Sequence, residues 1–137
     1  MTFAESIGTY LHNHSGLAAL VGTRIYPVRA PDSPTFPYVT YRIRVEPEDV
    51  LTGGAPIDRA TITLSAFART GTGTSGYALA HSVADQLRAA LAYFRGTLAA
   101  SGASSEGSLM TSTEDGESSE FGVFETVTEV EMYYCPS

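Results

Sequence analysis

The sequence contains no lysine and a single cysteine, Cys135. One cysteine cannot form an intrachain disulfide and cannot hold a metal through a thiolate cluster. Long apolar stretches are also missing, since none approaches the roughly 20 residues that a membrane-spanning helix requires. The first residues, MTFAESIGTYLHNH, lack the basic start and the apolar run of a secretory signal. Together these absences predict a soluble, intracellular domain without a cofactor.

The 137 residues have a globular balance, with 43% hydrophobic and 17% charged residues. A chain of this length buries roughly two-thirds of its unfolded surface on folding, so it can build a core without metals or disulfides. We find no internal repeat and no linker between domains. We therefore expect one domain that spans residues 1–137.

Charge is distributed unevenly along the chain, whose net charge is −7. All eight basic residues are arginines within residues 1–100, which also hold seven acidic residues. Residues 101–137 contain the other eight acidic residues and no base. This balance argues against a protein that grips the nucleic-acid backbone, because that task needs a basic face.

Helical and strand patterns alternate along the chain. Apolar residues at helical spacing predict a long helix over 75–95 and a helical segment over 3–21 that breaks near residues 12–16. Alternating apolar and polar residues predict strands over 38–45, 60–68 and 121–134, with another around 108–113. This order predicts an α+β fold, an antiparallel sheet of about four to five strands with a long helix packed on one face and an N-terminal helical segment.

Small polar residues and glycines mark the predicted ends of the helices. Ser15 is a candidate cap for the second half of the N-terminal segment, and Gly22 for its end. Thr74 or Ser75 is expected to cap the long helix, and Gly96 to end it.

Two segments stand out between the predicted elements. Residues 46–58 contain two prolines and two glycines and predict an extended hairpin arm. Its apolar side chains, Val50, Leu51 and Ile57, are candidates for an interface because a small domain cannot easily cover them. Residues 100–120 are rich in serine, glycine and acidic residues and predict a flexible acidic region.

The sequence offers little that supports catalysis. His12 and His14 are expected to be a surface pair rather than metal ligands, and His81 a half-buried helix residue. Residues 71–76 read G-x-G-x-x-G, but no parallel strand with an acidic end follows the helix, so a helix-capping loop is favoured over a nucleotide site. No G-x-S-x-G motif is present. We therefore predict that the chain is not an enzyme and has no catalytic, metal or cofactor site.

Two further segments point to a family. Residues 17–27 read LAALVGTRIYP, and residues 36–41 read FPYVTY. They resemble the tail terminator or tail completion family of long-tailed bacteriophages, in which L-x-x-L-V-G-x-R-I-Y-P precedes a P-Y-V-x-Y strand. The alternating strand over 61–67, the helix end LAYFRGT and the final strand are also similar to that family, so the resemblance extends over essentially the whole chain.

The resemblance implies a structural virion protein without catalysis or cofactor. Members of this family form a hexameric ring that stops growth of the tail tube and joins it to the head connector, with DNA passing through the centre. The implied partners are further copies of the chain, the tail tube protein and a head completion or connector protein. DNA would pass without sequence-specific binding, and no membrane is involved. The implied location is the head–tail junction of the virion, after synthesis in the host bacterial cytoplasm.

A ring around DNA gives the charged side chains candidate roles. Glu125, Glu129 and Glu131 share one face of the last predicted strand and are candidates to face the lumen, where carboxylates would not retain phosphate. Arg42 and Arg44 are candidates to pair with part of this acidic set across strands or between subunits.

Other expectations and alternatives accompany this reading. Arg24 is expected to bond the last carbonyls of the preceding helix, and Pro37 to fix the entry to the following strand. Another head–tail connector component is an alternative function, because it would share the ring geometry. A small ligand-binding or enzymatic domain that uses the glycine-rich loop is a more distant one.

Overall fold

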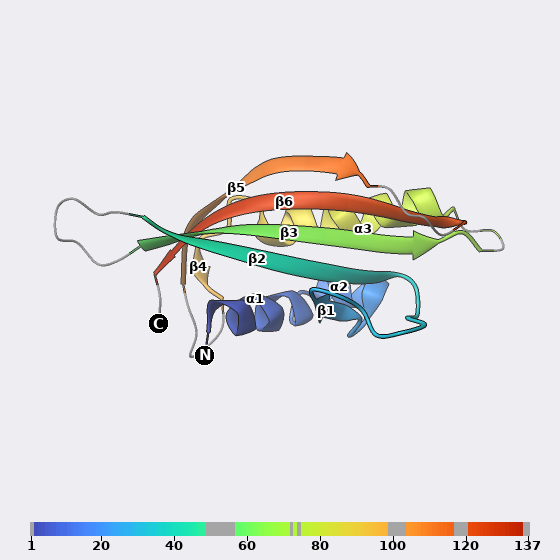
Figure 1. Ribbon diagram of the computed structural model, residues 1–137, viewed down its shortest axis with the longest axis horizontal. Helices are drawn as coiled ribbons and strands as arrows, with labels where there is room; N and C mark the ends of the chain where they lie inside the picture. Colours follow the sequence, from blue (N-terminus) through green and yellow to red (C-terminus); the bar gives the residue numbers. More distant parts are fainter. Residues whose placement is uncertain are drawn as a thin grey trace.

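The computed structural model describes residues 2–48, 57–71, 73, 75–98, 104–116 and 121–135. These residues form an α+β structure in which helices pack on one face of a six-stranded sheet (Figure 1). In chain order the elements are α1 (Phe3–His12), α2 (Ser15–Val21), β1 (Ile25–Pro27), β2 (Tyr38–Glu48), β3 (Ile57–Arg69), α3 (Gly76–Leu91), β4 (Gly96–Thr97), β5 (Ser104–Asp115) and β6 (Val123–Cys135).

The strands lie in the order β1-β2-β3-β6-β5-β4. Four long strands, β2, β3, β6 and β5, form an antiparallel centre, while β1 is parallel to β2 and β4 antiparallel to β5 at the two edges. The predicted fold class is therefore confirmed. The sheet has more strands than the predicted four to five because β1 and β4 are too short to show a sequence period.

The core lies between the sheet and the helices. Buried residues alternate with partly exposed ones along β3, as expected for a strand with one covered face. Helix α3 lies behind β3 and β6 in Figure 1, and α1 and α2 lie beside β1 and β2. The largest fully buried side chains include Ile7, Leu11, Leu17, Ile62, Leu64, Leu87, Leu91 and Met132. Burying each such side chain contributes about 1.5–3 kcal/mol.

The N-terminal helical segment breaks where the sequence predicts, but its second half is capped differently. Thr2 and Glu5 form a capping box at the start of α1. The N-cap of α2 is His14, whose Nδ1 accepts a hydrogen bond from the Leu17 N–H at 3.3 Å. The prediction of Ser15 as the cap is therefore wrong, because the chain becomes helical one residue earlier. Gly22 ends α2 at φ +59°, as predicted.

Helix α3 starts as predicted and ends early. The Ser75 side chain accepts from the Ala78 N–H and caps the helix. The helix stops at Leu91 rather than at residue 95, so Gly96 is not its cap. The Ser108 hydroxyl of β5 accepts a hydrogen bond from the Phe94 N–H at 2.7 Å and donates one to the Leu91 carbonyl. These two bonds satisfy backbone groups that a further helical turn would otherwise pair. None of the described helices is long and apolar enough to span a membrane.

Two segments predicted to be irregular are partly strand. The described parts of the 46–58 arm belong to β2 and β3, with Glu46 opposite Arg59 and Glu48 opposite Ile57. Within 100–120, residues 104–115 form β5, which pairs with β6 from Thr126 to Cys135. The strand predicted around 108–113 thus lies inside β5, which is longer than predicted because pairing with β6 orders a segment of weak strand propensity.

Arg24 connects two segments of the chain rather than closing the helix. Its Nε donates to the Pro37 carbonyl at 2.9 Å, immediately before β2. The helix end is closed instead by the Arg24 backbone N–H, which donates to the Val21 carbonyl at 3.0 Å. The prediction for the guanidinium is wrong, since the side chain crosses to the strand entry.

Candidate assembly surface

The face of the sheet opposite the helices, here called the open face, is not covered by any described element. Its residues are partly or fully exposed, whereas most of their neighbours on β3 and β6 are buried. By register, the open face consists of Tyr38, Thr40, Arg42, Arg44 and Glu46 of β2, Arg59, Thr61, Thr63, Ser65 and Phe67 of β3, Glu125, Val127, Glu129, Glu131 and Tyr133 of β6, and Leu109, Ser112 and Glu114 of β5.

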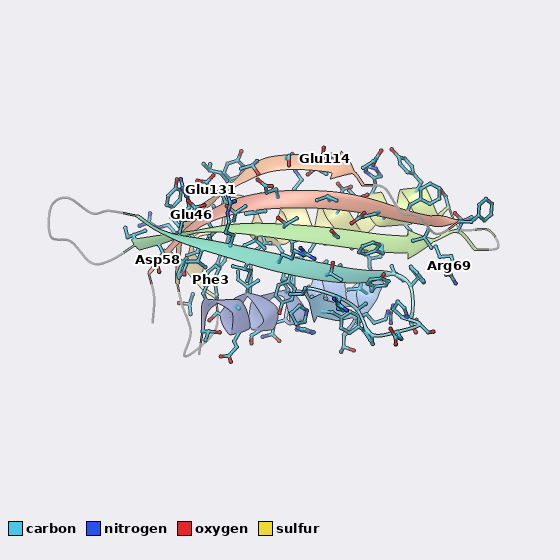
Figure 2. All side chains as sticks on the ribbon, in the orientation of Figure 1. Phe3, Glu46, Asp58, Arg69, Glu114 and Glu131 are labelled. Atoms are coloured by element: carbon cyan, nitrogen blue, oxygen red, sulfur yellow. The ribbon has the colours of Figure 1, made fainter. Side chains whose placement is uncertain are left out.

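Ion pairs gather at one end of the open face, near the end of β2. Arg59 bridges two strands, because its Nη2 lies 2.9 Å from Glu46 Oε2 and its Nη1 lies 3.7 Å from Glu131 Oε1. Arg44 Nε lies 3.1 Å from Glu46 Oε1. Figure 2 shows Glu46 and Glu131 at this end of the sheet and Arg69 at the opposite end. This network bridges β2, β3 and β6 on the open face.

The acidic residues of β6 also bond their neighbours. The Tyr133 hydroxyl donates to Glu131 Oε1 at 2.9 Å, and this hydrogen bond raises the pKa of Tyr133. The Thr111 hydroxyl lies 3.1 Å from Glu129 Oε1 and 3.0 Å from the Glu129 carbonyl. These bonds orient the carboxylates without neutralising them.

Arginine and glutamate occupy the same rows of the sheet. Arg42 and Glu129 both pair with Thr63, and Arg44 and Glu131 both pair with Thr61, from opposite sides of β3. Each arginine is therefore two strands, about 10 Å, from the glutamate of its row. A shallow hollow lies between them, lined by Arg42, Ile43, Arg44, Thr61, Thr63 and Glu129.

The candidate interface residues fall in different places. Arg42 and Arg44 lie exposed on the outer strand of the open face, and Arg44 pairs with Glu46 of its own strand rather than with the acids of β6. Ile57 is half-buried at the start of β3. Val50 and Leu51 lie outside the described residues.

The candidate lumen residues are on one face, as their spacing predicts. Glu125, Glu129 and Glu131 all lie half-buried on the open face of β6. Glu114 of β5 extends this acidic set on the open face. Arg59 is not among the predicted site residues, although extending the predicted strand 60–68 by one residue places it on the open face.

Asp115 lies on the helix-covered face and contacts α3. Its Oδ1 is 2.7 Å from His81 Nε2, and its Oδ2 accepts from the Tyr77 hydroxyl at 3.0 Å. The bond to the carboxylate raises the pKa of Tyr77. This cluster fastens the start of α3 to the end of β5, which is a packing role, and His81 is half-buried as predicted.

Metal and nucleotide sites find no support among the described residues. They contain no group of three or more His, Cys, Asp or Glu side chains that would hold a metal. The glycine-rich segment 71–76 follows β3, whose two neighbours, β2 and β6, are both antiparallel to it. A dinucleotide fingerprint requires a parallel βαβ unit, so this segment lacks the context for nucleotide binding.

Comparison with known proteins identifies the family. Residues 5–131 match the family of the tail completion protein gp17. Because the match takes in nearly the whole chain, the chain belongs to the tail completion protein gp17 family. It is thus a structural component of a virion tail and not an enzyme.

Solved structures share the fold. A chain from the virion of a native gene transfer agent (GTA) particle is 18% identical, with a TM-score of 0.76 over 97% of this chain and 94% of that chain. A second solved chain is 15% identical, with a TM-score of 0.50 over 98% of this chain and 95% of its own length. No curated protein sequence matches the chain.

Proposed function

We propose that the protein forms a hexameric ring that terminates the tail tube and joins it to the head connector, with DNA passing through the centre. Membership of a tail completion family supports a place at the end of the tail. The likeness to a chain of a gene transfer agent virion is consistent with a role in a tailed particle. The partners are then further copies of the chain, the tail tube protein and a head completion or connector protein.

The acidic part of the open face carries this proposal. Glu114, Glu125, Glu129 and Glu131 lie on adjacent strands of a face that the described residues leave uncovered. A conduit for DNA works best when its wall does not bind phosphate, because cationic contacts release counterions and retain the nucleic acid. We infer that these carboxylates line the lumen or its rim.

Electron microscopy with purified tail tubes and purified connectors tests the proposal. We expect rings of six copies that cap one end of the tubes and stop their growth. Mass photometry of the same sample would give the ring mass. Tubes that grow to unlimited length without any decoration would overturn the proposal. Binding to connectors but not to tubes would instead favour another head–tail connector component.

A further inference from the structure

Two edges of the sheet carry backbone groups that the described chain leaves without partners. Strand β1 pairs with β2 only over residues 39–41, and β4 pairs with β5 only over residues 104–105. Beyond these contacts β2 continues to Glu48 and β5 to Asp115. Open edges of this length are templates for pairing with another chain.

The hydrogen bonds to the β1 side show which groups of β2 are available. The Val39 N–H and the Tyr41 carbonyl both bond toward that side, at 3.0 and 2.9 Å. Backbone groups of alternate residues in a strand point to the same edge. Ile43 and Val45 therefore direct an N–H and a carbonyl each to the open edge, just past the end of β1.

Backbone hydrogen bonds also show which groups of β5 are available. The Gly116 N–H donates to the Glu125 carbonyl at 2.9 Å, so this residue faces β6. Glu114 shares that direction, and Thr113 and Asp115 direct their backbone groups away from β6. Among the residues that the structure describes, no other strand pairs with β5 at these two positions.

Direction and charge make the two edges complementary. The strands β2, β3, β6 and β5 are antiparallel throughout, so β5 runs opposite to β2. A β5 edge can therefore join the β2 edge of another copy in an antiparallel ladder, and the repeat can continue. On the open face the β2 edge carries Arg42 and Arg44, while the β5 edge carries Glu114.

We propose that β5 of one copy pairs antiparallel with β2 of the next copy, with Glu114 directly opposite Arg44. Asp115 then lies opposite Ile43, and Thr113 opposite Val45, so that the outward backbone groups of both strands are bonded. This pairing rests on the proposed ring and specifies how its subunits join.

The register suits a closed sheet. Within one copy, Glu114 lies in a row with Val127, Ser65 and Thr40. If Glu114 instead pairs with Arg44 of the next copy, the row meets β2 four residues further along the strand than Thr40, a displacement of about 13 Å. This displacement accumulates across the four strands of one copy, which span about 19 Å. The strands would then tilt by about 35°, which lies in the range of closed β-barrels.

The surroundings leave room for the incoming strand. The β1 ladder ends where Val28 bonds the Tyr41 carbonyl, and Asp115, the last residue of the neighbour's β5, would pair with Ile43 just past that point. At the other end, Pro47 has no N–H and would come level with Thr111, where a bulge interrupts β5. Arg44 is 73% exposed in its pair with Glu46, and such exposed pairs rearrange at little cost.

Disulfide cross-linking of assembled rings tests the register. A non-hydrogen-bonded antiparallel pair has Cα atoms about 4.5 Å apart, which a disulfide can span. We would combine Arg44→Cys and Glu114→Cys in one chain, together with Cys135→Ser to remove the native thiol. Mild oxidation in the presence of tail tubes should yield a covalent ladder that ends at the ring size.

Three controls make the result specific. Arg44→Cys with Thr113→Cys should not cross-link, because Thr113 is one residue away and on the other face of the sheet. A mixture of the two single variants should give only mixed dimers, because the contact is head-to-tail. Arg44→Glu should raise the concentration at which rings form, and adding Glu114→Arg should restore it even if the cysteine variants assemble poorly.

The outcomes separate this inference from the proposed function. Rings that cap tubes without the 44–114 cross-link would overturn the edge pairing and leave the ring intact. Cross-linking of Arg44→Cys to itself would show a symmetric contact and would also overturn the pairing. Absence of rings and of tube capping in every condition would overturn both.

Discussion

Arg24 Nε donates a hydrogen bond to the Pro37 carbonyl over 2.9 Å and so ties the exit of α2 to the entry of β2. The two segments that carry the family resemblance, residues 17–27 and 36–41, are therefore in direct contact. Both residues are half-buried, whereas most residues of the loop between them are exposed. The arginine of the motif thus serves the fold, by fixing where the first long strand begins.

Replacing Arg24 with alanine should lower the free energy of unfolding by about 1–2 kcal/mol, because the Pro37 carbonyl then loses its charged donor while half-buried. Urea denaturation followed by circular dichroism would measure the change. Arg29→Ala is the matched control, since Arg29 is exposed in the adjoining loop and should stay within about 0.5 kcal/mol. Equal effects of the two substitutions would contradict the assigned role.

Replacing His14 with alanine should cost about 0.5–1 kcal/mol, because the Leu17 N–H loses the acceptor that caps α2. His14→Asn should retain most of the stability, since asparagine is a strong N-cap residue. Ser15→Ala should be close to neutral, because Ser15 is the first residue of the helix and not its cap. Thermal unfolding of the three variants would show which residue caps α2. A larger loss of stability for Ser15→Ala than for His14→Ala would assign the cap to Ser15 instead.

The parts of the fold that the sequence predicts are those with a local period. Alternation of apolar and polar residues from Ala60 to Ala68 is sufficient to predict β3, because burial of every second side chain follows from strand geometry alone. Strand β5 is only partly predictable. Its register shifts at 105/107 and 110/112 break the alternation, and its serines, threonines and acids have little strand preference of their own.

Tertiary contacts decide the rest. Helix α3 stops at Leu91 because Ser108, which is distant in sequence, bonds both sides of the helix end. In the candidate surface, the shared face of Glu129 and Glu131 follows from spacing in one strand. The bridge from Arg59 to Glu46 and Glu131 depends on the register of three strands, which no single-strand pattern contains.

The Tyr134 hydroxyl should make folding stability fall at high pH. Burial, followed by the influence of Asp58, raises the pKa of Tyr134 to about 12. A raised pKa in the folded state means that the stabilisation is complete below the ordinary value of 10.0 and is lost as pH rises toward 12. The loss amounts to about 2–3 kcal/mol.

Tyr134→Phe isolates this effect, because it retains the ring that stacks on Phe3 at 3.8 Å. Denaturation at pH 9 and pH 11.5 should show a smaller loss of stability for this variant than for the native protein. Tyr93→Phe should behave like the native protein, since Tyr93 is 77% exposed. Parallel curves for all three proteins would contradict the assignment.

Neutralising lumen carboxylates should favour assembly at low salt. Several copies of Glu125 and Glu129 would repel one another in a ring, and salt screens such repulsion over roughly 8–10 Å. Glu131 is less suited to this test because it pairs with Arg59.

The Glu125→Gln and Glu129→Gln double variant retains the shape of both side chains and leaves Arg44 and Glu114 unchanged. Light scattering at about 20 mM salt should show ring formation at a lower protein concentration than for the native chain, and the two should converge near 0.5 M, where the Debye length falls below about 5 Å. Assembly that weakens in the double variant would show instead that these carboxylates bond a cationic partner at an interface, and the lumen assignment would be wrong.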